Sequence, residues 1–104
     1  IRQERDMAEK TLTKDEQLFL YLVSTFQSSA IIAMGKIKNP MTDGFEKNLE
    51  QATFYISLLD TVQKRTMGNL SQEEEQFLIT AVSDLNMTMI EEKQKLQKDM
   101  KAKS

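Results

Sequence analysis

Three adjacent glutamates, Glu73, Glu74 and Glu75, form the densest group of carboxylates in the chain. Divalent cations such as Ca²⁺ and Mg²⁺ prefer carboxylate oxygens as ligands, so the triplet is a candidate metal site. Adjacent residues of a helix point in different directions, however, and only residues three or four apart share a face. The triplet is therefore typical of a helix start, where acidic side chains favour the positive end of the helix dipole. No metal site is predicted.

The residue types that most enzymes use for acid–base and nucleophilic chemistry are missing. The chain contains no histidine and no cysteine, which excludes a Ser-His-Asp triad, a thiolate nucleophile, a zinc knuckle and a disulfide bond. Tyr21, Tyr55, Asp60 and Asp84 fall on helical stretches, but neither a partner base nor a glycine-rich phosphate loop accompanies them. The sequence therefore favours a non-enzymatic protein with no catalytic residue and no cofactor.

Lysines dominate the C-terminal segment 93–104. Five lysines stand against one aspartate there, a net charge of +4, whereas residues 69–92 hold six acidic residues and no basic one. The tail could contact RNA, a membrane surface or an acidic protein, or it could be a solvated helix end. Nucleic acid is not expected as a partner, because the whole chain has a net charge of −2 and nucleic-acid-binding domains are normally basic. The candidate tail contacts are Lys93, Lys95, Lys98, Lys101 and Lys103.

Two capping boxes mark the starts of helices. Thr13 with Glu16, and Ser71 with Glu74, have the spacing at which a hydroxyl and a carboxylate satisfy the first backbone N–H groups of a helix. Apolar residues at helical spacing follow each box and also fill the segment between them. We expect helices over residues 14–35, 46–67 and 72–95.

Turn-forming residues separate these helices. Pro40 disfavours helical geometry at the residue before it, Asp43-Gly44 is a turn dipeptide, and Gly35 and Gly68 suit helix ends. The chain has only three glycines and one proline in 104 residues, which favours long helices over strands joined by many turns. We therefore expect an all-α fold, a three-helix bundle built from helical hairpins and completed by self-association. The expected organisation is a polar lead-in (1–13), a helical domain (14–92) and a lysine-rich helical extension or frayed tail (93–104).

The first expected helix contains seventeen consecutive uncharged residues, 18–34. A core helix, a self-association helix and a membrane span are the three possible interpretations. A direct membrane span is not expected, because a span needs about 20 predominantly apolar residues and this run holds five polar residues near its middle. Two short partner helices cannot cover a helix that is apolar on all sides, which favours self-association. The predicted interaction face is Leu18, Leu22, Thr25, Phe26, Ser29 and Ala33.

Several strings of the sequence resemble a small bacterial family, DUF1844, a domain of unknown function. The resemblance rests on the segment 19–35, Asn39-Pro40-x-Thr42-x-Gly44, residues 48–52 and the stretch 66–75 with its Gly-Asn-Leu-Ser and glutamates. It covers about residues 18–92. Asn86 and Met89 stand where the family pattern leads us to expect an arginine and an aromatic residue. The resemblance implies a bacterial, helical, soluble protein with no established reaction, ligand or catalytic residue.

Together these observations give two functional expectations. The leading one is a non-enzymatic interaction module that self-associates, or docks into a larger assembly with another protein subunit, through the first helix. The alternative is an accessory subunit of a membrane- or ribosome-associated complex, held partly by the basic tail. No signal peptide is recognisable in the charged N-terminal segment, so a cytoplasmic location is expected.

Overall fold

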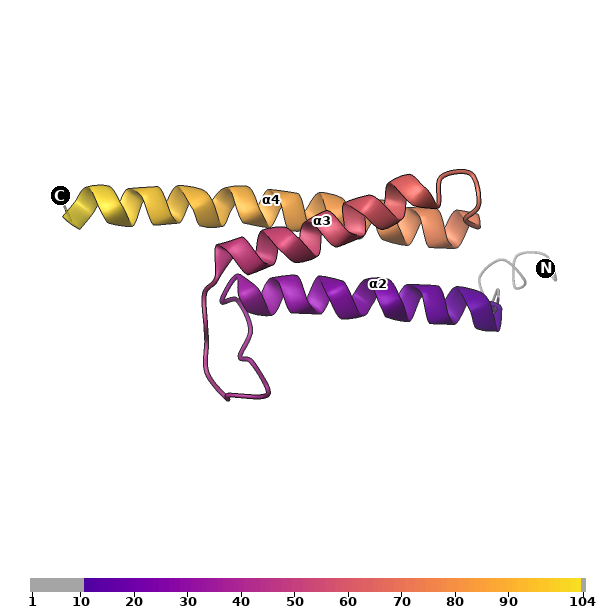
Figure 1. Ribbon diagram of the computed structural model, residues 1–104, viewed down its shortest axis with the longest axis horizontal. Helices are drawn as coiled ribbons and strands as arrows, with labels where there is room; N and C mark the ends of the chain where they lie inside the picture. The colour runs from indigo at the N-terminus through magenta and orange to yellow at the C-terminus, as the bar shows by residue number, and fades with distance from the viewer. Residues whose placement is uncertain (1–10, 104) are drawn as a thin grey trace, which may run out of the picture.

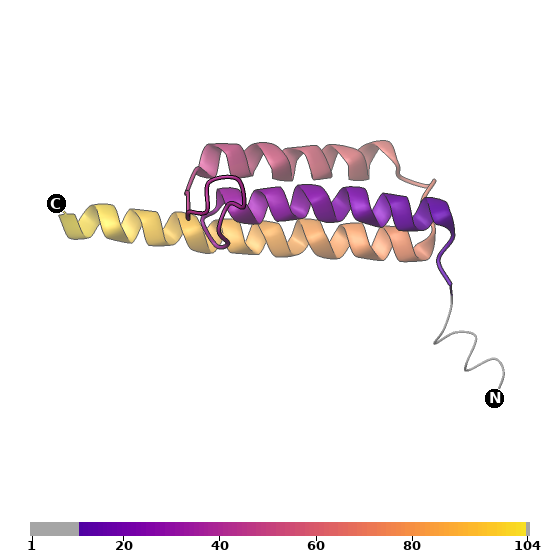
Figure 2. The ribbon, with the colours of Figure 1, turned by 90° about the horizontal axis from the view of Figure 1, so that it is seen from below.

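The computed structural model describes residues 11–103, which form an all-α three-helix bundle (Figure 1). The helices are α2 (Lys14–Ala33), α3 (Leu49–Arg65) and α4 (Gln72–Lys103). Helices α2 and α4 run in the same direction and α3 runs antiparallel to both, as Figures 1 and 2 show. Each helix contacts the other two. The predicted all-α three-helix bundle is confirmed, while most of the predicted lead-in lies outside the described residues.

Both predicted capping boxes are present. The Thr13 hydroxyl accepts a hydrogen bond from the Glu16 N–H at 3.0 Å, and the Thr13 N–H donates to the Glu16 carboxylate at 2.9 Å. Ser71 and Glu74 make the same reciprocal pair, at 3.2 and 2.8 Å. The starts of α2 and α4 are therefore fixed by local chemistry that can be recognised in the sequence.

The loop between α2 and α3 shortens both helices relative to the prediction. Helix α2 ends at Ala33 because Gly35 adopts the left-handed conformation, with φ +80°, and turns the chain away. Helix α3 begins at Leu49, three residues later than expected, because the Asn48 side chain caps it by accepting from the Gln51 N–H at 3.0 Å. The Asn48 N–H donates to the Ala33 carbonyl at 2.7 Å, which ties the two ends of the loop together.

Helix α4 extends beyond the predicted end at residue 95. It runs to Lys103, about 48 Å at ~1.5 Å per residue, and projects past the ends of the other two helices (Figures 1 and 2). Lysine, glutamine, leucine and alanine are good helix formers, and neither glycine nor proline interrupts the segment. The tail is therefore a helical extension as far as the structure describes it.

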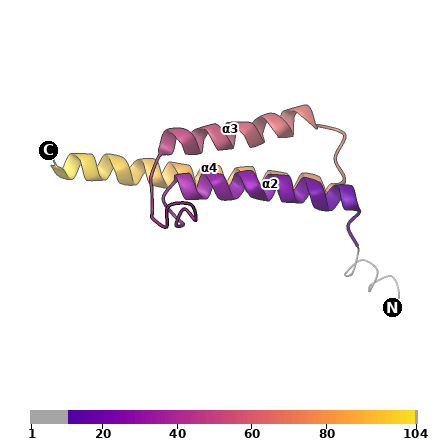
Figure 3. The same cartoon turned by 60° about the horizontal axis from the view of Figure 1, so that its bottom comes forward.

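The core is formed by apolar residues at helical spacing on all three helices. Ala52, Ile56 and Leu59 of α3 are buried, as are Leu85 and Met89 of α4. Small side chains, Ala30 and Ala33 of α2 and Ala81 of α4, lie between the larger ones and are also buried. Figure 3 shows α2 in front of α4 and running alongside it, with α3 above both in this view. Among residues 11–103, no helix covers the outer side of α2.

Candidate interaction surface

The predicted interaction face divides along α2 into an exposed half and a buried half. Leu18 is 56% exposed, Leu22 is 41% exposed, and Thr25 is also exposed. Phe26 packs against the core, Ser29 is half-buried and Ala33 is buried. The close approach at Ala33 is made by the chain's own backbone, through the hydrogen bond from Asn48. The surface available to a partner therefore lies in the first half of α2.

One large residue of this surface was not assigned to the face by the sequence. Tyr21 is 73% exposed and lies between Leu18 and Leu22 on the same side of the helix. Positions 18, 21, 22 and 25 follow the spacing that places residues on one helix face. The same spacing could have assigned Tyr21 to this face from the sequence. We name Leu18, Tyr21, Leu22 and Thr25 the α2 flank.

Aromatic side chains continue the apolar surface from α2 onto α3. The Phe26 and Tyr55 rings lie 6.3 Å apart between centroids, and the Phe54 ring meets Tyr55 edge-on at 5.7 Å. Phe54 itself is exposed. Exposed apolar side chains are ordinary when single, whereas a contiguous group indicates a contact surface.

The residues considered for acid–base chemistry do not converge. Asp60 forms an ion pair with Lys64 one turn later on α3, at 3.1 Å, whereas Asp84 is exposed on α4. Tyr21 belongs to the α2 flank, and Tyr55 packs against the core. Within residues 11–103, no group of three or more Asp or Glu side chains is arranged to hold a metal ion, the Glu73–Glu75 triplet included.

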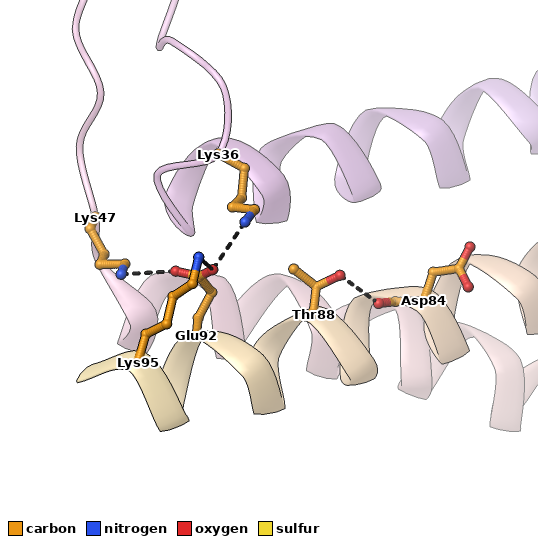
Figure 4. Close-up of polar contacts among 6 residues, drawn as sticks. All are labelled: Lys36, Lys47, Asp84, Thr88, Glu92 and Lys95. Atoms are coloured by element: carbon orange, nitrogen blue, oxygen red, sulfur yellow. Dashed lines mark hydrogen bonds and ion pairs between the residues drawn. The ribbon is translucent and has the colours of Figure 1, made fainter. Parts of the chain in front are cut away.

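A buried carboxylate joins three parts of the chain at the opposite end of the bundle. Glu92 is 2% exposed and lies on the buried side of α4. Its Oε1 pairs with Lys47 Nζ at 2.8 Å, and its Oε2 pairs with Lys36 Nζ at 3.1 Å and with Lys95 Nζ at 3.5 Å (Figure 4). We name these four residues the Glu92 cluster. It links both ends of the loop to α4 and was not predicted from the sequence.

The lysines of the Glu92 cluster keep its carboxylate ionised. The hydrogen bond from Lys47 is the largest cause that lowers the pKa of Glu92 to about 2. Burial acts in the opposite direction, and Lys36 adds a further hydrogen bond and charge that lower the pKa. A signal was present in the sequence: Glu92 falls three residues after Met89 on the buried stripe, where a carboxylate needs cationic partners.

The predicted tail contacts lie on the α4 extension, which we define as residues 93–103. Lys93, Lys95, Lys98 and Lys101 are exposed, and the side chain of Lys103 lies outside the described part. Leu96 and Met100, four residues apart, are 42% and 61% exposed. The extension therefore combines lysines with an apolar pair. None of the helices in the described part is long and apolar enough to cross a membrane.

Comparison with known proteins identifies a family without a known activity. The family model described as "Domain of unknown function (DUF1844)" matches residues 16–95, most of the chain. No curated protein and no solved structure gives a significant match. The matched range contains all of α2 except its first two residues, all of α3, and α4 as far as the Glu92 cluster.

Proposed function

This chain belongs to the DUF1844 family, and from that premise we propose that it is a non-enzymatic helical interaction module that self-associates, or docks into a larger assembly, through the α2 flank. The family description assigns no reaction or ligand. The proposal is supported by the surface of the bundle and by the absence of histidine and cysteine from the sequence.

The exposure of the α2 flank is the observation that carries the proposal. Leu18, Tyr21 and Leu22 are 41–73% exposed on one side of a helix whose opposite side forms the core. Fully burying one such side chain contributes roughly 1.5–3 kcal/mol, so covering three of them favours association substantially. Neighbouring Ser29 is small enough for a partner helix to approach closely.

A Ser29→Glu variant is expected to convert the associated protein to a monomer without loss of helix content. The introduced carboxylate would be trapped at the edge of the contact surface, where burying an unpaired charge is costly. Light scattering coupled to size-exclusion chromatography measures the mass, and circular dichroism measures the helix content.

Ser57→Glu is the matched control, since Ser57 is an exposed serine on α3 outside the α2 flank. This variant is expected to keep the wild-type mass. A wild-type protein that is monomeric at micromolar concentration, without any partner, would contradict self-association.

A second candidate function is that of an accessory subunit of a membrane- or ribosome-associated complex, held partly by the tail. The exposed lysines on a helix that projects from the bundle favour this alternative. Deleting residues 93–104 should then weaken recovery with anionic vesicles or ribosomes and make the remaining binding less sensitive to salt. Unchanged recovery would count against it.

A further inference from the structure

We infer that the α2 flank is covered by the α4 extension of a second copy of this chain, in a reciprocal antiparallel dimer. The inference rests on the proposed function, because it takes the α2 flank as the contact surface. It goes further by naming the segment that occupies this surface.

The α4 extension has the features of a helix that packs against another helix. Leu96 and Met100 continue the stripe of Leu85, Met89 and Glu92, with a spacing of three or four residues at each step. The stripe is buried as far as Glu92 and exposed beyond it. Most of the stability of a protein helix comes from the packing of its apolar face, so covering this apolar pair would stabilise the extension.

A chain cannot cover its own flank with its own extension. Leu22 lies twelve residues before Met34, or about 18 Å along α2 at ~1.5 Å per residue. The extension leaves the bundle beyond the far end of α2, where Glu92 contacts Lys36 (Figures 1 and 2). Leu22 and Leu96 of one chain are therefore more than about 20 Å apart by the same rise per residue.

A second copy related by a twofold axis can place its extension on the α2 flank. If two copies lie antiparallel, the extension of each reaches the first half of the other's α2, and the same contact is made twice. The spacings also agree, because Leu18 and Leu22 are four residues apart, as are Leu96 and Met100. In an antiparallel pair Leu96 meets Leu22 and Met100 meets Leu18. Each helix then contributes a row of residues at i and i+4, and such rows pack against each other between helices.

Charge favours the same arrangement. The end of the bundle that carries the α2 flank has an excess of acidic residues, Asp15, Glu16 and the Glu73–Glu75 triplet against Lys14, Lys64 and Arg65, whereas the other end carries the lysines of the extension. Antiparallel copies bring the basic end of one chain to the acidic end of the other, and parallel copies would oppose like charges. An anionic lipid surface would also attract the lysines, but it would leave the α2 flank uncovered at the far end.

Engineered cysteines test the inference directly, because the natural chain has none. A Leu22→Cys chain and a Leu96→Cys chain, one carrying a larger tag, are co-expressed and oxidised. A disulfide requires Cα atoms within about 7 Å, so we expect a mixed dimer joining one chain of each kind, resolved by mass under non-reducing conditions. Ser57→Cys with Leu96→Cys is the control pair and is expected to stay uncross-linked.

The outcomes separate this inference from the proposed function. Cross-linking of Leu22→Cys only to itself, or a dimer without the mixed product, overturns the inference and leaves self-association in place. A monomer that binds vesicles of anionic lipid overturns the inference and self-association together, and favours the second candidate function. Two results together support the inference: formation of the mixed disulfide, and conversion of the dimer to a monomer by Leu96→Glu.

Discussion

A Met89→Ala variant is expected to lose about 3 kcal/mol of the free energy of unfolding, the typical cost of removing a large buried side chain and leaving a cavity. Met89 is a buried residue of α4 and belongs to the hydrophobic core. In a domain of this size such a loss lowers the melting temperature by roughly 15 °C. Chemical denaturation of both proteins at one concentration measures the difference.

Met87 provides the matched control for this variant. It lies two residues earlier on the same helix but faces solvent. Met87→Ala is expected to change the free energy of unfolding by no more than about 0.5 kcal/mol. Equal losses in the two variants would show that the face of α4 packed against the bundle has been wrongly assigned.

Replacing Glu92 by glutamine is expected to remove about 2 kcal/mol of stability at neutral pH. The depressed pKa of Glu92 corresponds to an upper value of about 3 kcal/mol by linkage. We discount it because Lys36, Lys47 and Lys95 are partly exposed and water screens their charges. Urea denaturation at neutral and acidic pH measures the effect.

The pH dependence has a defined sign. The pKa of Glu92 is lower in the folded chain, about 2 against 4.5, so its stabilisation is complete above pH 4.5 and is lost as the pH falls towards 2. The difference between wild type and Glu92→Gln should shrink over that window. Glu91→Gln, at the exposed neighbouring position, is the control; an equal effect at both positions would contradict the role of the Glu92 cluster.

Local chemistry made much of the fold predictable. Capping boxes at Thr13 and Ser71, glycines at helix ends and apolar periodicity act within a few residues, so they can be recognised without knowledge of the fold. The start of α3 was missed because Asn48 competes as a cap and its N–H is held by Ala33 across the loop. The sequence leaves the end of α4 open between a helical extension and a frayed tail, because nothing in it terminates the helix.

The candidate surfaces were harder to predict than the helices. The α2 flank was found in part, because helical spacing identifies a face but does not say which half the other helices cover. The Glu92 cluster joins residues 56 positions apart, Lys36 and Glu92, and only the packing of α2 against α4 brings them together. A carboxylate on an apolar stripe indicates that a cationic partner is needed. Which residue that partner is depends on the tertiary fold.

The backbone hydrogen bond between Asn48 and Ala33 also has a consequence for how the chain tolerates change. Because this bond and the adjoining bridge of Met34 with Lys47 hold the base of the loop, the geometry of the two helix ends does not depend on the loop's tip. Lengthening a closed surface loop costs little entropy. Insertions or altered residues around Met41, which is almost fully exposed, should therefore accumulate in evolution with little penalty to the bundle.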